Sequence, residues 1–97
     1  MFEEILKQNP GDAFTRYGLA MEYAKLGRTE LSLAEFSKLL DGHPDYTAGY
    51  FMAAQTLLAA GRPEEARSRL REGIASASRT GNSHALSEIQ AVLDGLE

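Results

Sequence analysis

The chain contains no cysteine, and valine occurs only once among its 97 residues. Without cysteine, there is no disulfide, no thiolate metal site and no cysteine nucleophile. No apolar run approaches the roughly 18–20 residues that a membrane span requires. The acidic beginning of the chain, MFEEILKQ, lacks the basic and apolar regions of a secretory signal. These absences lead us to expect a cytoplasmic protein with no part in the membrane.

Positive charge is also scarce. Ten lysines and arginines are outnumbered by fourteen aspartates and glutamates, so the net charge is −4 and the pI is about 5.1. Binders of nucleic acids and anionic membranes normally carry a basic surface, so this balance argues against both. With 43% hydrophobic and 25% charged residues, the composition is that of a globular protein. The length predicts a single domain over residues 1–97.

The composition favours helices over strands. Stretches rich in Ala, Leu, Glu and Arg, which are good helix formers, alternate with turn signals that contain glycine or proline. None of these stretches shows the alternation or the β-branched enrichment of a strand. Gly27 and Gly61 can adopt a positive φ and so end one helix before the next begins. We predict six helices, at residues 2–8, 12–25, 29–41, 46–59, 63–78 and 82–96.

Many residues recur at a spacing of 34. At least seven identities share this single offset, which is more than chance gives in so short a chain. A unit of two helices every 34 residues is the arithmetic of a helical repeat protein. The identical pairs include Phe2 and Phe36, Leu6 and Leu40, Pro10 and Pro44, Ala20 and Ala54, Gly27 and Gly61, Arg28 and Arg62, and Glu30 and Glu64.

The repeat resembles the tetratricopeptide family. That family's signature is Trp-x2-Leu-Gly-x2-Tyr, followed by Ala-x3-Phe and then Pro. The first complete repeat follows it with Leu19, Tyr23, Phe36 and Pro44, and departs from it at Arg16, where the family has an aromatic residue. The second repeat is looser. Its signature positions hold Tyr50, Ala53, Ala54, Leu57, Ala66 and Leu70, with Ser78 in the place of proline.

The resemblance implies an all-α fold, an α-α superhelix in which helical hairpins stack into a right-handed solenoid of about 2.5 repeats. It also implies the division of the six helices. Residues 1–10 would be the second helix of a truncated repeat, residues 13–46 and 47–80 two full repeats, and residues 82–96 a C-terminal capping helix.

The resemblance further implies a concave face, lined mainly by the first helix of each repeat. There we expect a groove for a peptide or a helix of an unidentified partner protein, because aromatic side chains give large contact areas at low entropic cost. The alternative is that the C-terminal helix or a second copy of the chain covers the aromatic residues of this concave face. Members that clamp a C-terminal carboxylate use Lys, Asn and Arg, whereas the positions here hold Tyr17, Met21 and Met52, so we expect no such clamp. The candidate groove residues are Phe14, Tyr17, Met21, Phe51 and Gln55.

The first predicted helix presents an apolar face formed by Phe2, Ile5 and Leu6, with no preceding helix to complete its repeat. This apolar face would be buried within the chain if the first helix folds back on the helix that begins near Asp12. Otherwise a second molecule would cover it in a symmetric homodimer. A self-associating structural module is therefore the alternative to a partner-binding adaptor.

The charged and polar residues suggest no catalytic or metal-binding site. There is no Gly-x-Ser-x-Gly elbow and no glycine-rich phosphate loop. His84 and Glu88 share a helical face, but a metal site needs three or four ligands. Five arginines gather near residues 62–79, with glutamates three or four positions from Arg67 and Arg69, which favours a salt-bridged solvated face. We predict no enzymatic activity, no cofactor and no metal.

Overall fold

The computed structural model of the chain describes residues 2–9 and 11–96, without the side chain of Phe2. These residues form six helices and no strand, so the prediction of an all-α fold is confirmed. Every helix end lies within two residues of its predicted position. The helices are α1 (Phe2–Gln8), α2 (Ala13–Lys25), α3 (Thr29–Gly42), α4 (Thr47–Ala59), α5 (Pro63–Thr80) and α6 (Ser83–Leu96).

Local signals in the sequence explain where the helices begin and end. The carboxylate of Asp12 accepts a hydrogen bond from the Thr15 backbone N–H at 3.1 Å and so caps α2. Pro63 occupies the first turn of α5, where an amide hydrogen is not needed. Gly27 and Gly61 have φ values of 75° and 73°, as predicted, and lie in the turns after α2 and α4. Gly81 ends α5 in the same left-handed conformation, with φ of 70°.

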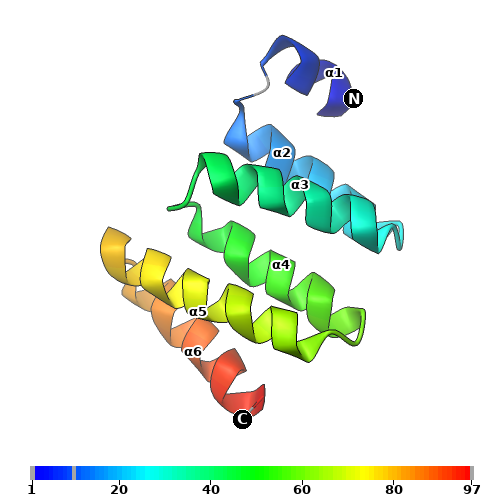
Figure 1. Cartoon of the computed structure of the whole chain (residues 1–97). Coiled ribbons are helices and arrows are strands. Elements are labelled where there is room, and N and C mark those ends of the chain that lie inside the picture. The colour runs from blue at the N-terminus through cyan, green and yellow to red at the C-terminus, as the bar shows by residue number, and fades with distance from the viewer. Residues whose placement is uncertain (1, 10, 97) are drawn as a thin grey trace.

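The helices stack as hairpins along one axis, with α1 at one end and α6 at the other (Figure 1). Within the stack, α2 packs on α3, α4 on α5, and α5 on α6, while α3 and α4 join neighbouring hairpins. Helix α1 packs on α2. The two termini lie at opposite ends of a body that measures 40 × 30 × 17 Å.

Two apolar clusters hold the stack together, and α4 contributes to both. The first cluster joins α2, α3 and α4 around Phe36 and Leu39, which are fully buried. The second joins α4, α5 and α6 around Leu70 and Ile89. Because each cluster is built from neighbouring hairpins, no hairpin buries its apolar residues alone.

Buried hydroxyl groups make hydrogen bonds between neighbouring helices. Ser32 Oγ on α3 donates a hydrogen bond of 2.8 Å to the carbonyl of Ala20 on α2. Thr47 on α4 and Ser76 on α5 share a hydrogen bond of 2.7 Å between their hydroxyl oxygens. The small side chains let the backbones come together, and the hydrogen bonds satisfy the polar atoms that this approach buries.

Candidate functional site: the face formed by α2, α4 and α6

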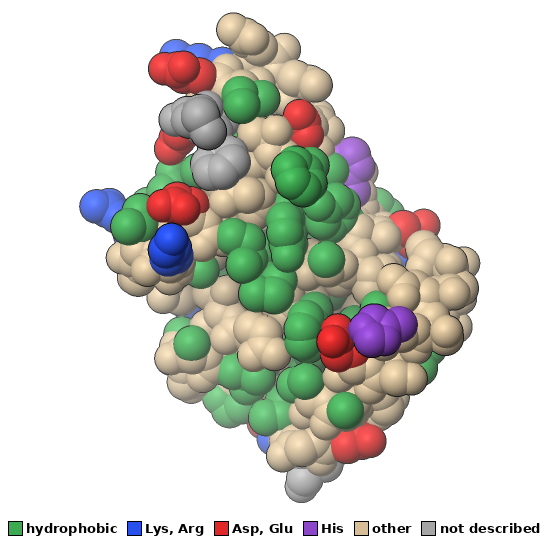
Figure 2. Space-filling view, turned by 180° about the vertical axis from the view of Figure 1, so that it is seen from behind, with side chains coloured by type: hydrophobic (Ala, Val, Ile, Leu, Met, Phe, Trp, Pro, Cys, Tyr) green, Lys and Arg blue, Asp and Glu red, His purple; other side chains and the backbone are tan. Residues whose placement is uncertain are grey.

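The first helices of the hairpins, α2 and α4, form one face of the molecule together with α6, which we call the α2–α4–α6 face. Figure 2 shows hydrophobic side chains running down the middle of this face, with most charged side chains along its borders. The central helix, α4, has no charged residue among its 13 positions, although several of its side chains are exposed or half-buried. The face therefore combines an uncharged centre with polar edges.

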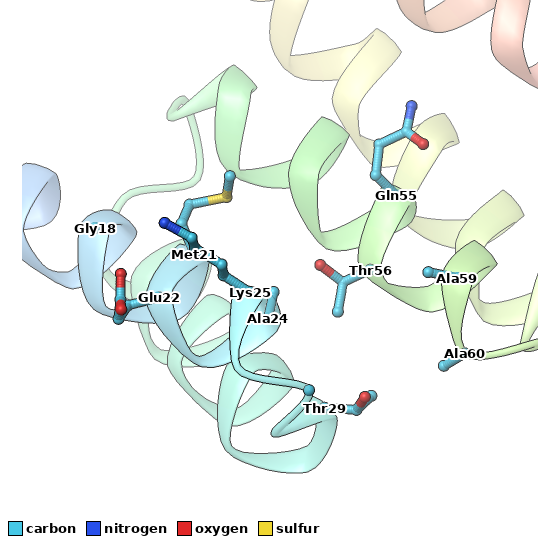
Figure 3. Close-up of a pocket in the computed structure, with 11 residues that line it drawn as sticks. Gly18, Met21, Glu22, Ala24, Lys25, Thr29, Gln55, Thr56, Ala59 and Ala60 are labelled. Atoms are coloured by element: carbon cyan, nitrogen blue, oxygen red, sulfur yellow. The ribbon is translucent and has the colours of Figure 1, made fainter.

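A hollow on this face lies between α2 and α4, and we call it the α2–α4 hollow. Its volume is about 650 Å³ (Figure 3). In Figure 3, Met21 and Thr56 extend into the space between the two helices, whereas Glu22 projects from the other side of α2. Helix α6 contributes no lining residue, so the α2–α4 hollow is not covered from within the described chain. The lining residues are Gly18, Met21, Glu22, Ala24, Lys25, Gly27, Thr29, Gln55, Thr56, Ala59 and Ala60.

A smaller hollow of about 130 Å³ lies between α4 and α6, and we call it the α4–α6 hollow. Phe51 lines it and also packs against the second apolar cluster. Glu88 lines the same hollow. The other lining residues are Thr47, Ala48, Asn82, Ala85 and Ile89.

The five predicted groove residues fall at different places on this face. Met21 and Gln55 line the α2–α4 hollow, and Phe51 lines the α4–α6 hollow. Phe14 stands 75% exposed in the first turn of α2 and lines neither hollow. Tyr17 also lines neither and is half-buried.

Tyr17 packs into the first apolar cluster instead of standing free. Its ring centre lies 6.4 Å from that of Phe36 in an edge-to-face arrangement, and 5.4 Å from that of Tyr46. Burial, with a smaller contribution from the neighbouring Tyr46, raises the pKa of the Tyr17 phenol above its ordinary value. Tyr17 therefore packs α2 against α3 and against the residue that precedes α4.

The three predicted self-association residues lie on α1. Leu6 is buried within the chain, and Ile5 is 40% exposed. The side chain of Phe2 lies outside the described residues. Helix α1 folds back on α2, and the Tyr23 hydroxyl reaches Glu3 at 3.5 Å across this contact. Part of the apolar face of α1 is thus satisfied by α2, and Ile5 remains accessible.

The arginines of α5 and its flanks pair with acids, as the sequence indicates. Arg62 binds Glu65 at 2.9 Å and also reaches Glu30 on α3 at 2.5 Å. Arg69 lies 3.3 Å from Glu72, the pairing expected from the sequence. Glu65 pairs with Arg62 and not with Arg69, four positions after it. The hydrogen bond from Arg62 lowers the pKa of Glu65.

His84 and Glu88, one turn apart on α6, lie next to each other. His84 is 90% exposed and lies 3.9 Å from Glu88. In the part of the chain that the structure describes, no three His, Asp or Glu side chains gather as metal ligands would. Across the same residues, no helix has both the length and the hydrophobicity to span a bilayer.

Sequence reasoning missed the residues that create the α2–α4 hollow. These are small: Gly18 on α2, Ala59 at the end of α4 and Ala60 directly after it. Large apolar residues draw attention as anchors, but a hollow is made by the absence of side-chain volume. The signal was present as small residues on first helices of successive hairpins.

Comparisons with known proteins identify relatives over most of the chain. A family model described as tetratricopeptide repeat matches residues 23–88. A TPR repeat-containing protein of Pseudomonas aeruginosa is 27% identical over 95 residues, which cover 98% of this chain and 90% of that protein.

Solved structures of similar shape include a tetratricopeptide repeat domain protein from Salinibacter ruber. Its solution structure matches with a TM-score of 0.85 and 32% identity, over 92% of this chain and 90% of that one. The type III secretion translocator chaperone SycD of Yersinia enterocolitica, in a form described as an alternative dimer, matches with a TM-score of 0.87. That match covers 98% of this chain and 73% of SycD, and its 20% identity speaks for a shared fold alone.

Proposed function

Since this chain belongs to the tetratricopeptide repeat family, we propose that it is a protein–protein interaction module whose α2–α4–α6 face binds a segment of a partner protein. The observation that carries the proposal is the charge-free helix α4, which lies between two hollows and presents Ala48 and Ala59 to solvent. A helix without charge on any side is normally buried. Here one side of α4 is open, and a partner would complete its burial.

The groove residues that sequence analysis selected retain distinct parts in this proposal. Met21, Gln55 and Phe51 would contact the partner, because they line the hollows. Phe14 would contact it at the edge of the face. Tyr17 would hold the wall in place through its contacts with Tyr46 and Phe36. We propose that the protein acts as an adaptor in the cytoplasm, in keeping with a sequence that has no cysteine.

Photocrosslinking tests this proposal in cells of the source organism. A photoreactive benzoyl-phenylalanine replaces Gln55 in one variant and Ser68, an exposed residue of α5, in the other. We expect a discrete crosslinked partner from position 55 and none from position 68. Adding Ala59→Arg, which places a long charged side chain at the α2–α4 hollow, should remove the crosslink, whereas Ser68→Arg should not. Equal crosslinking from both positions, or none from position 55, would contradict the proposal.

The second candidate function is self-association through α1. Ile5 is 40% exposed, whereas Leu39, the residue 34 positions later, is completely buried. The difference marks a place where α1 has less cover than the corresponding part of α3. If a second copy supplies that cover, light scattering will give twice the mass of 10.6 kDa, and Ile5→Glu will restore the single mass. A wild-type protein that is monomeric at every concentration would rule this function out.

A further inference from the structure

The second helices of the two hairpins, α3 and α5, are separated by a cleft, which we call the α3–α5 cleft. Its volume is about 290 Å³. Both helices lie within the described residues, and no Cα atom of α3 is within 8 Å of a Cα atom of α5. The buried residues Ala53 and Leu57 of α4 line the cleft between them. A direct connection between α3 and α5 must therefore come from long side chains.

Two arginines cross the α3–α5 cleft, and we call their bonds to α3 the arginine bridges. Arg62, directly before α5, binds Glu30 in the first turn of α3 at 2.5 Å. Arg69, seven positions later, donates to the Ser37 hydroxyl of α3 at 3.1 Å. Seven residues are about two helical turns, so the bridges leave α5 at points roughly 10 Å apart. Both bonds are attractive, and together they draw α5 toward α3.

Each arginine is held in this orientation by a glutamate three positions later. Arg62 donates to both carboxylate oxygens of Glu65, at 2.9 Å each. Arg69 donates to Glu72 at 3.3 Å. The Arg62 and Arg69 side chains are 33% and 24% exposed, so most of their surface is already covered. Less conformational freedom is then lost when a further N–H group of the same guanidinium binds α3, which favours the bridges.

The contact between α3 and α4 separates the α3–α5 cleft from the α2–α4 hollow. This contact is tight at Gly49, where an added Cβ atom would lie 2.9 Å from Leu40 Cδ2 and 3.0 Å from Leu39 Cδ2. Helix α4 packs on α5, and α2 packs on α3, so each hairpin moves as a unit. A rotation of the second hairpin about the α3–α4 contact moves α5 away from α3 and the opposite side of α4 toward α2. Opening the cleft therefore narrows the hollow.

From this geometry we infer that the arginine bridges hold the α2–α4 hollow open from the other side of the stack. With both bridges made, α5 stays near α3 and the hollow keeps its width. Without them, the second hairpin rotates and α4 approaches α2. Salt weakens the bridge between Arg62 and Glu30, because Glu30 is 80% exposed and the Debye length is only about 3 Å at 1 M. This inference goes beyond the proposed function, because it concerns the width of the hollow and not what binds there.

Pulsed electron paramagnetic resonance measures the two widths separately. The chain has no cysteine, so two introduced cysteines carry the only spin labels. One labelled pair, Glu22→Cys with Ala59→Cys, joins α2 to α4 and reports on the hollow. The other pair, Lys38→Cys with Ser68→Cys, joins α3 to α5 and reports on the cleft. All four positions are exposed, so the labels should not disturb the core.

Breaking both bridges should change the two distances in opposite directions. In Arg62→Gln with Arg69→Gln, we expect the cleft distance to become longer and the hollow distance shorter. Glu30→Ala with Ser37→Ala breaks the same bridges from α3, leaves α5 unaltered and should give the same two shifts. Arg67→Gln is the matched control, because Arg67 binds a glutamate of α5 and a carbonyl oxygen of α6. It should leave both distances unchanged.

Salt provides an independent test of the bridge between Arg62 and Glu30. Raising sodium chloride from about 0.1 M to about 1 M should shift both distances in the same directions as the substitutions do. Arg62→Gln should remove this response. The inference is overturned if the bridge variants leave both distances unchanged or change both in the same direction. It is also overturned if Arg67→Gln causes equal shifts, or if salt acts equally with and without Arg62.

Discussion

Replacing Gly73 with alanine is a stringent test of the packing between α4, α5 and α6. Gly73 is a buried residue of α5, and a Cβ atom there would lie 3.0 Å from Tyr50 Cβ and 3.1 Å from Ile89 Cδ1. Both distances are shorter than ordinary van der Waals contacts, so α5 must shift away from α4 or Ile89 must change its rotamer. Overpacking of this kind costs about 1–3 kcal/mol.

The same substitution also has a favourable term. Alanine is favoured over glycine in a helix interior by about 1 kcal/mol. Gly95→Ala on α6 provides the matched control, because nothing lies within 4 Å of the Cβ atom added there. That variant should be as stable as the wild type or more stable, by up to about 1 kcal/mol. We therefore expect Gly73→Ala to be less stable than Gly95→Ala by about 1–3 kcal/mol.

Urea unfolding followed by circular dichroism measures the difference, with equal m-values showing that the unfolded states are comparable. A double-mutant cycle adds Ile89→Val, which removes the Cδ1 atom. Gly73→Ala should cost less in that background than in the wild type, because one of the two close contacts is gone. If Gly73→Ala is as stable as Gly95→Ala, the close approach of these three helices is refuted.

Three further predictions concern polar groups. Thr47→Val removes one member of the buried hydroxyl pair with Ser76 and should destabilise the fold by about 1–3 kcal/mol, while the double variant with Ser76→Ala should cost less than the two single changes together in urea unfolding. The backbone N–H of Thr15 lowers the pKa of Asp12, so the stability that this carboxylate adds is complete above its ordinary pKa of 3.8 and is lost as the pH falls through the lower folded-state value. Asp12→Asn caps without titrating and should therefore lose less stability between pH about 7 and 3, and an equal loss would contradict the assignment. Burial raises the pKa of Tyr17, so stability that is complete below 10.0 declines as the pH rises through the higher folded-state value. Thermal melts of Tyr17→Phe should show a smaller decline at alkaline pH, and a decline equal to that of the wild type would count against the burial of the phenol.

The positions of the helices could be predicted from the sequence because their signals are local. Asp12 caps α2 through a residue three positions away, and Gly27 ends a hairpin turn through its own φ value. The end of α5 was predicted at residue 78 and lies at Thr80, directly before the left-handed Gly81. The sequence predicts the turn at Gly81 but not the last two helical residues before it, so the error is confined to these two residues.

The roles of the groove residues could not be predicted in the same way, because they depend on which neighbour a side chain meets. Helical spacing puts Tyr17 and Met21 on one face of α2, one turn apart. Met21 reaches the α2–α4 hollow, whereas Tyr17 turns against Tyr46, which lies 29 positions later. The helical spacing is the same for both residues, so the difference between them comes from Tyr46, whose position beside α2 the spacing does not indicate.

The composition of α4 connects the stability of the stack with its proposed use. A helix in the middle of a stack must be apolar toward both neighbours, and α4 meets this need with Ala53 in the first cluster and Leu57 in the second. Stacking places no such demand on Ala48 and Ala59, which are exposed, and a charged side chain at either position would cost the fold little. The outer helices do carry charge on this side, at Lys25 and Glu88. Small uncharged residues on the open side of α4 therefore serve no need of the stack itself. Their effect is to keep both hollows accessible, which is what a binding surface requires.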